Sequence, residues 1–346
     1  MIYFNNDYSE GCHPRILARL ADTNLEQTPG YGTDGYCLRA AALIKKLCNC
    51  ETLDVHFLVG GTQTNLTVID SLLRPHQGVI SAESGHIEVH ETGAVEATGH
   101  KVLTLPSEDG KITAKQIADC ITAHYEDESA EHTVQPGMVY ISNPTELGTL
   151  YSCKELTEIS ETCKKHGLYL FMDGARLGYG LTAEGNDLTM EDVARLCDVF
   201  YIGGTKVGAL FGEAVVFSDL RISKDFRYMI KQHGGMLAKG RLLGLQFCTL
   251  LEDGLYFELG RHANHLADQI RQTLDSLGYP YLVPGITNQI FPIFPNTVVE
   301  ALRKEFCFNV QQKVDDAHTA VRFCTSWATR QENVDALCEK LRALSK

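Results

Sequence analysis

One lysine of this sequence lies within an otherwise apolar, glycine-rich stretch. Lys206 is the only charged residue of FYIGGTKVGALFG, which extends from Phe200 to Gly212. Withdrawing an amine from water is unfavourable, and burial lowers the pKa of a lysine. The resulting neutral amine is a nucleophile that condenses with aldehydes. We therefore predict a catalytic amine at Lys206, against the alternative of an ordinary loop lysine on the surface.

Pyridoxal 5'-phosphate is the aldehyde that such a lysine would hold best, as an imine, and this cofactor needs further partners. Asp173 follows a second apolar stretch and could keep the ring nitrogen protonated, although Asp-Gly is also a common turn pair. The segment Gly60–Asn65 lies between a strand pattern and a helix pattern, so its N–H groups could bind the phosphate. His86 and Ala175 could pack on the two faces of the ring.

The elements that must position these residues are short apolar strands alternating with helices. We predict strands at Val55–Val59, Val79–Ser81, Met138–Ser142, Leu168–Met172 and Val199–Ile202. The polar and glycine residues above follow the ends of these strands, and a helix is predicted from Lys154 to Gly167. This alternation predicts an α/β fold with a parallel sheet covered on both faces. Ligands of such sheets bind beyond the carboxyl ends of the strands, which predicts one shared pocket.

The pattern changes near Gly240. A long helix is predicted over Arg241–Leu255, and strands are predicted around 288–294 and 321–325. We therefore predict three parts of the chain: an N-terminal segment (1–30), a large cofactor-binding domain (31–240) and a small α+β domain (241–346).

Composition narrows the class of function. The 346 residues are 44% hydrophobic and 22% charged, with a net charge of -13 that is not gathered in a block. This charge disfavours binding to nucleic acid and to anionic membranes. No apolar run approaches the ~20 residues of a membrane span, and the first residues do not resemble an export signal. The twelve cysteines are scattered without a C-x-x-C pair, which predicts reduced thiols in a cytoplasmic protein.

Together these motifs resemble the threonine aldolase family of fold-type-I pyridoxal-phosphate enzymes, which is related to β-eliminating lyases. The motifs are Gly60–Asn65, His86 with Glu91–Ala94, Asp173–Arg176 and Thr205-Lys206, and the resemblance extends from Asn6–Ser9 to Arg322–Trp327. It implies the aspartate aminotransferase fold, with a mostly parallel seven-stranded sheet in the large domain. It also implies a homodimer or homotetramer with the site at the dimer interface, where the stretch 231–236 would reach the partner's phosphate.

The resemblance also implies a role for each matching residue. Lys206 would hold the cofactor, Asp173 would pair with its ring nitrogen, and Gly61 and Thr62 would bind its phosphate. Thr205 would also contact the cofactor. His86 would stack on the ring near the substrate hydroxyl. Ser9 and Arg322 would bind the substrate carboxylate. Arg176 would approach either that carboxylate or the cofactor's phenolic oxygen. Glu91, or a water that it holds, would be the general base.

Plainer interpretations stand beside these roles. Ser9 could be a helix cap, Arg322 a bridge between domains, and Glu91 a solvated helix carboxylate. His86 and His90 have the i, i+4 spacing of metal ligands, but no third ligand is evident, so we expect no metal.

The activity implied is retro-aldol cleavage of a β-hydroxy-α-amino acid, L-threonine or L-allo-threonine, to glycine and an aldehyde by a carbon–carbon lyase. The alternatives are another fold-type-I enzyme (a β-eliminating amino-acid lyase or an aminotransferase) and a non-catalytic binding protein. The chain departs from the family at one point: many members carry a histidine where this sequence has Thr145 and Glu146, either of which could replace it.

Overall fold

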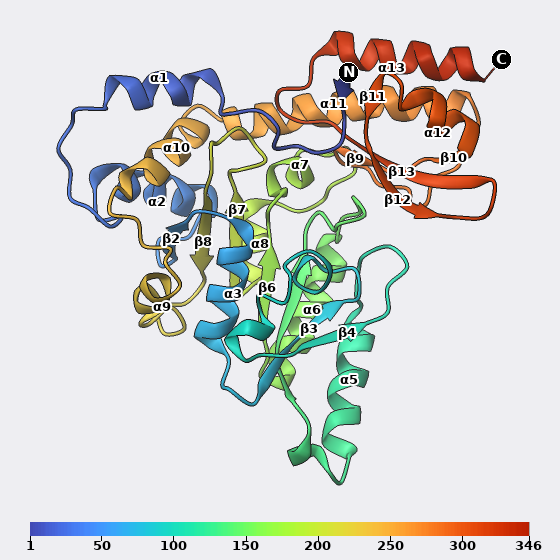
Figure 1. Ribbon diagram of the computed structural model, residues 1–346. Coiled ribbons are helices and arrows are strands. Elements are labelled where there is room, and N and C mark those ends of the chain that lie inside the picture. Colours follow the sequence, from blue (N-terminus) through green and yellow to red (C-terminus); the bar gives the residue numbers. More distant parts are fainter. Residues whose placement is uncertain (346) are drawn as a thin grey trace.

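A seven-stranded sheet forms the centre of the computed structural model, which describes residues 1–345 (Figure 1). In spatial order the strands are β2 (Asp54–Leu58), β8 (Glu213–Phe217), β7 (Val199–Gly203), β6 (Tyr169–Asp173), β5 (Gln135–Ser142), β3 (Gln77–Ala82) and β4 (Val102–Leu105). β8 is antiparallel to both of its neighbours, whereas β7, β6, β5, β3 and β4 pair in parallel. The mostly parallel seven-stranded sheet that the family resemblance implies is therefore present.

Helices pack on both faces of this sheet. One face is covered by α2 (Gly35–Leu47), α5 (Ala114–Glu126), α6 (Cys153–His166), α8 (Met190–Leu196) and α10 (Arg241–Leu251), and the other by α3 (Gly61–Leu72), α4 (His86–Val89) and α9 (Phe226–Gln232). Side chains of one strand alternate between the two cores: Val139 of β5 packs in the first, and Met138 and Tyr140 pack in the second. Both faces are apolar, which explains why the strands read as continuous hydrophobic runs.

A smaller antiparallel sheet lies in the C-terminal part (Figure 1). It contains β10 (Ile293–Pro295), β13 (His318–Cys324), β12 (Asn309–Lys313) and β9 (Gln289–Ile290). The first strand of the chain, β1 (Ile2–Tyr3), pairs in parallel with β11 (Phe306–Cys307). The remaining elements are α1 (Pro14–Asp22), η1 (Glu96–Thr98), η2 (Ala130–His132), α7 (Leu177–Leu181), α11 (Leu255–Ser276), α12 (Asn296–Leu302) and α13 (Gln331–Leu344).

The long helix α11 connects the two hydrophobic cores. Leu255 and Leu259, near its start, pack with the core of the large sheet, whereas Ile270 and Leu274 pack with the C-terminal core. α10 lies against α2 on the large sheet. The domain boundary after Gly240 stays a prediction. The side chains of α10 pack in the core of the large sheet, although α10 follows that boundary.

The predicted helix over Arg241–Leu255 is two helices in the structure. α10 ends at Leu251, and α11 begins after Gly254, whose φ of 74° lies in the left-handed region. That conformation interrupts a right-handed helix, and glycine adopts it readily. The helix predicted up to Gly167 is confirmed, because α6 ends there with glycine in the same conformation.

Two further findings concern membranes and thiols. No helix within residues 1–345 combines the length and the apolar character required to cross a bilayer. All twelve cysteines are free thiols, and seven of them are buried.

Candidate active site

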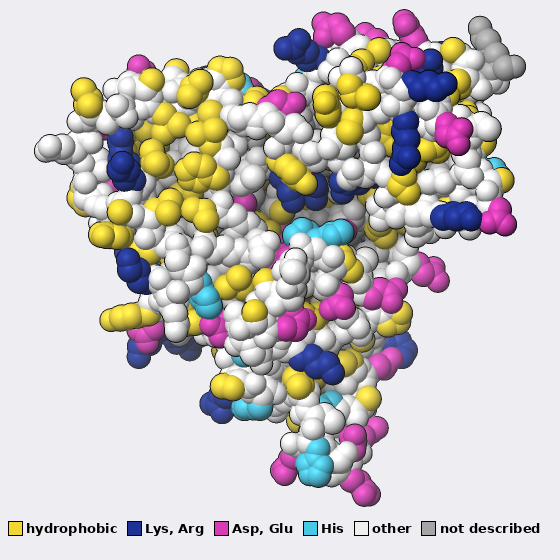
Figure 2. All heavy atoms as spheres, viewed as in Figure 1, with side chains coloured by type: hydrophobic (Ala, Val, Ile, Leu, Met, Phe, Trp, Pro, Cys, Tyr) yellow, Lys and Arg dark blue, Asp and Glu magenta, His cyan; other side chains and the backbone are white. Residues whose placement is uncertain are grey.

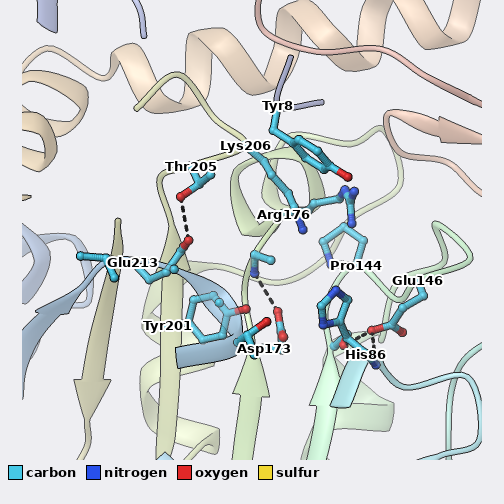
Figure 3. A pocket seen from close by; sticks show the side chains of 16 residues that line it. Tyr8, His86, Pro144, Glu146, Asp173, Arg176, Tyr201, Thr205, Lys206 and Glu213 are labelled. Carbon is cyan, nitrogen blue, oxygen red and sulfur yellow. Dashed lines mark hydrogen bonds between the residues drawn. The ribbon is translucent and has the colours of Figure 1, made fainter. Parts of the chain in front are cut away.

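A cleft opens at the carboxyl ends of the parallel strands. An inner cavity of about 300 Å³ is lined by residues that include Gly61, His86, Asp173, Tyr201 and Lys206 (Figure 3). An outer cavity of about 700 Å³ shares Tyr8, His86, Glu146, Arg176 and Lys206 with it, so the two form one continuous site. Figure 2 shows Lys, Arg and His side chains gathered in a hollow between the large sheet and the C-terminal part.

Lys206 lies in the turn that follows β7. The turn is held by hydrogen bonds from the backbone N–H groups of Val207 and Ala209 to the carbonyl oxygen of Gly204. Desolvation of the amine, together with the positive charge of Arg176, lowers the pKa of Lys206, and the acidic groups Asp7, Asp173 and Glu213 only partly oppose this. The amine is therefore easier to deprotonate than that of an exposed lysine, which is the condition for a nucleophile.

Asp173 ends the neighbouring strand β6 as a buried carboxylate. Its Oδ2 accepts hydrogen bonds from the Tyr140 hydroxyl (2.6 Å) and the Asn65 amide (3.1 Å), and its Oδ1 accepts one from the N–H of Ala175 (2.9 Å). Burial raises the pKa of Asp173, but the charge of His86 and the donated hydrogen bonds outweigh it, so the pKa is lowered. The site thus holds a fixed negative charge beside Lys206.

Gly174 is required by the close approach of β6 to β7. A Cβ atom at this position would lie 1.8 Å from the carbonyl oxygen of Tyr201. No side chain can be accommodated there, which explains the glycine of the Asp173–Arg176 motif. The approach sets Asp173 and Lys206 at the same edge of the sheet.

His86 is oriented by a chain of buried hydrogen bonds. Its Nδ1 lies 2.6 Å from Oε1 of Glu91, and the Asn65 amide donates to the same oxygen (2.7 Å) as well as to Asp173. The Glu91 side chain has no exposed surface, and it lines neither cavity. Glu91 therefore contacts His86 on the side of the ring that faces away from the cavities.

The start of α3 forms another wall of the cavity. Gly60, Gly61 and Thr62 line it, and no side chain caps the first turn of this helix. The N–H groups at a helix start carry partial positive charge and bind anions. A Cβ atom at Gly61 would lie 3.1 Å from the hydroxyl of Tyr201, so glycine keeps this wall open.

Thr205 and Glu213 line the same cavity as that helix start. The Thr205 hydroxyl donates to Oε1 of Glu213 (2.9 Å), and the N–H of Gly204 donates to Oε2 (3.3 Å). Burial raises the pKa of Glu213 to about 8. The carboxyl is thus largely neutral at pH 7, which removes repulsion toward an anion bound nearby.

Arg176 and Arg322 supply cationic groups to the cleft. Arg176 donates to both carboxylate oxygens of Asp7, from Nε to Oδ2 (2.7 Å) and from Nη2 to Oδ1 (3.0 Å). Arg322 lines the outer cavity and donates to the backbone oxygen of Asn5 (2.9 Å) and to Gln289 (3.3 Å). Two arginines in one cleft provide a site for a carboxylate.

The structure brings most of the predicted site residues to one cavity, and it places others elsewhere. Gly61, Thr62, His86, Asp173, Arg176, Thr205 and Lys206 line the inner cavity, and Arg322 lines the outer one. Ser9 is exposed, lines neither cavity and donates to the side chain of Asn6 (2.9 Å); its neighbour Tyr8 lies in the site instead. Of the residues at the departure from the family, Glu146 lines both cavities and Thr145 lines neither.

The histidine pair His86 and His90 lies near the cleft with ring centroids 5.6 Å apart. Across residues 1–345 no group of three or more His, Cys, Asp and Glu side chains is arranged to hold a metal ion.

The residues present fit pyridoxal phosphate. The cavity offers a deprotonatable amine, a carboxylate and an uncapped helix start in one enclosure, which are the contacts for its aldehyde, ring nitrogen and phosphate. The buried hydroxyl of Tyr201 lines the same cavity beside Asp173 and adds a further polar group for a bound ligand.

Comparisons with known proteins agree with this geometry. The family model described as "Beta-eliminating lyase" matches residues 9–295. A low specificity L-threonine aldolase of Pseudomonas sp. (strain NCIMB 10558) is 33% identical, over 99% of this chain and 97% of that protein. A solved structure of Leishmania major threonine aldolase superposes with a TM-score of 0.97 at 46% identity, with all of both chains covered. Thermus thermophilus aspartate aminotransferase, at 14% identity and a TM-score of 0.74 over 99% of this chain and 91% of that one, shares the fold. The chain therefore belongs to the beta-eliminating lyase family, and the two relatives above that are more than 30% identical to it are threonine aldolases.

Proposed function

We propose that this protein is a pyridoxal-phosphate-dependent carbon–carbon lyase that cleaves a β-hydroxy-α-amino acid, L-threonine or L-allo-threonine, to glycine and an aldehyde. The family and the fold are those of pyridoxal-phosphate enzymes, and the full-length relatives are threonine aldolases. When bound, the cofactor supplies an electron sink for the pair left on Cα when the Cα–Cβ bond breaks. The protein's own residues bind, orient and exchange protons.

The observation that carries this proposal is a buried amine and a buried carboxylate at the ends of two adjacent strands, both with a lowered pKa. Lys206, after β7, has a lowered pKa and offers an amine for covalent attachment of the cofactor. Asp173, at the end of β6, stays ionised and would hold a proton on the ring nitrogen. An electron sink requires that proton, and Asp173 is the buried carboxylate of the cleft with the most donors fixing it.

The other residues would fix the cofactor and the substrate. Gly61 and Thr62, with Thr205 in the same cavity, would hold the phosphate at the start of α3. His86 would pack against the ring, oriented by Glu91, for which we now propose a positioning role. Arg176 and Arg322 would bind the substrate carboxylate, and Tyr8, which lines both cavities, would lie near the substrate in place of Ser9, which lines neither.

The test is incubation of the holoenzyme with L-threonine and, separately, with L-allo-threonine. Glycine and acetaldehyde in equal amounts are the expected products. 2-Oxobutyrate with ammonia would instead identify a β-eliminating lyase, and consumption of an added oxo acid would identify an aminotransferase.

We also propose that the protein is a cytoplasmic homodimer or homotetramer. Large apolar side chains remain exposed on the side of α1 and α2, among them Leu17 (61%), Leu25 (92%) and Leu38 (65%), and Figure 2 shows hydrophobic side chains gathered there. A second copy would cover such a patch. Light scattering after size exclusion should give a multiple of 38.3 kDa, and Leu38→Asp should shift the protein toward the monomer.

A further inference from the structure

Of the described carboxyl groups, Glu146 is the one that lines both cavities, and it forms no salt bridge with another residue of the cleft. It lies in the loop after β5 and lines the inner and the outer cavity (Figure 3). The Ser142 hydroxyl (2.6 Å) and the backbone N–H of His86 (3.0 Å) both donate to its Oε1. Within residues 1–345, Oε2 has no hydrogen-bond partner, so one oxygen is anchored and the other is available.

Cleavage of a β-hydroxy-α-amino acid needs a group that accepts the hydroxyl proton. Arg176 is cationic, and Lys206 is the amine proposed to hold the cofactor. Asp173 is engaged by three donors. Glu91 is buried behind His86 and reaches neither cavity.

His86 is held through its Nδ1, which lies 2.6 Å from Oε1 of Glu91, and the role proposed for its ring is to pack against the cofactor. Burial lowers the pKa of this ring, but the hydrogen bond to Glu91 and the negative charge of Asp173 outweigh this, so the pKa is raised. Of the described carboxyl groups, Glu146 is the one that lines both cavities.

We propose that Glu146 is the general base of the cleavage, an inference that rests on the proposed function. The hydroxyl O–H bond breaks, and its proton passes to Oε2 of Glu146. The O–H electron pair forms the aldehyde C=O bond as the Cα–Cβ bond breaks. The pair left on Cα then takes up one proton to give glycine, so the reaction neither gains nor loses protons overall.

The surroundings of Glu146 suit this role. Burial and the negative charge of Asp173 raise the pKa of Glu146, opposed by the hydrogen bond from Ser142 and the charge of His86. A glutamate with a raised pKa is a stronger base than an exposed one. Other titratable or charged groups near it are Tyr140 of β5, Tyr151, and Lys206 and Arg176 across the cleft.

The experiment compares two reactions of the holoenzyme in the variant Glu146→Gln. Aldehyde release from L-threonine and L-allo-threonine requires the hydroxyl proton to leave. Exchange of the glycine α-hydrogen with deuterated water, followed by proton NMR, uses the same cofactor site but involves no hydroxyl. Cleavage should fall roughly 10²–10⁴-fold, the range for loss of a general base, while glycine exchange stays within about threefold of wild type.

Matched variants complete the design. Glu88→Gln removes an exposed carboxyl from α4 and should leave both reactions unchanged. Glu146→Asp should restore part of the cleavage and move the acidic limb of the pH profile of kcat/KM. Near-wild-type cleavage by Glu146→Gln, or an equal loss of both reactions, would overturn the assignment. A wild-type enzyme that exchanges glycine but releases no aldehyde would instead refute the proposed function, and this inference with it.

Discussion

Asp7 and Arg176 form a two-pronged ion pair in the cleft, although 169 residues separate them in the chain. Asp7 is completely buried, and the amide of Asn288 also donates to it (3.0 Å). The pair joins the N-terminal segment, the large sheet and the C-terminal part around one guanidinium group. The charge of Arg176 outweighs the effect of burial and lowers the pKa of Asp7, so the pair is ionised at neutral pH.

Substitution of Asp7 tests whether this pair orients Arg176. Asp7→Asn leaves the buried guanidinium without a counter-charge, which costs roughly 3 kcal/mol of folding free energy. We expect KM for the amino acid to rise by about tenfold or more, because a freed Arg176 binds a carboxylate less precisely. Steady-state kinetics and urea unfolding measure the two effects. Glu10→Gln, a nearby exposed position, should change neither, and an unchanged KM in Asp7→Asn would contradict the role.

Substitution of Lys206 tests the attachment of the cofactor. In Lys206→Ala the amine is absent, so borohydride reduction of the holoprotein should leave no cofactor on the peptide that contains residue 206. Cleavage should fall by at least about 10³-fold, the order expected for loss of a covalent catalyst. Peptide mass spectrometry gives the readout, with the exposed Lys101→Ala as the control. Labelling of another lysine in the wild type would refute the assignment.

The contact between Glu91 and His86 predicts a change in titration. The hydrogen bond and charge of Glu91 raise the pKa of His86. Glu91→Gln keeps an acceptor but removes the charge, so the pKa of His86 should fall and cleavage should drop by about tenfold. NMR titration of the ¹⁵N-labelled ring measures this directly. Glu96→Gln, an exposed carboxyl in η1, should not shift the titration, and neither variant should abolish the fold.

Glu213 predicts a pH-dependent stability of the cofactor-free protein. Its pKa in the folded protein is about 8, above the ordinary glutamate value of 4.5. Between these values the folded state binds more protons than the unfolded state, so the free energy of unfolding falls as pH rises. Glu213→Gln should remove this slope, and wild type and variant should diverge progressively from about pH 4.5 to about pH 8.

Urea unfolding at successive pH values measures that divergence. The exposed Glu184→Gln should follow the wild type at each pH. A stability difference between wild type and Glu213→Gln that does not change with pH would show that Glu213 is already ionised in the folded protein.

The sequence predicts the sheet and much of the cleft because each relevant signal is local. Lys206, Asp173 and the Gly60–Asn65 segment directly follow apolar strands, and parallel strands bring their carboxyl ends to one edge. Ala175 lies at this edge as well, because it directly follows Asp173.

The sequence does not predict Glu213 as a site residue because its strand, β8, is antiparallel to its neighbours. It begins β8, which is antiparallel to β7 and β2, so the start of β8 lies at the edge where the other strands end. A search for polar residues after strands passes over a residue that precedes one. Tyr140 and Tyr201 are missed for another reason: their sequence pattern is that of ordinary buried strand residues, yet Tyr140 donates to Asp173 and Tyr201 lines the cavity.

Asp7 and Glu91 depend on contacts that no local pattern encodes. Arg176, the partner of Asp7, lies far from it in the sequence. Glu91 is buried where it accepts a hydrogen bond from the side chain of Asn65. Tyr8, not Ser9, enters the cleft because the Ser9 hydroxyl turns back to Asn6. One residue of difference in an irregular segment is beyond what periodicity can resolve.

The pairing of β1 with β11 anchors the segment before Asp7 to the C-terminal part of the fold. A ribosome must add more than 300 residues after Ile2 before its partner Phe306 exists. Asp7 follows β1 closely and forms the ion pair with Arg176, so this strand pairing helps to hold the carboxylate in place. A chain that stops before Phe306 lacks the strand that anchors this segment.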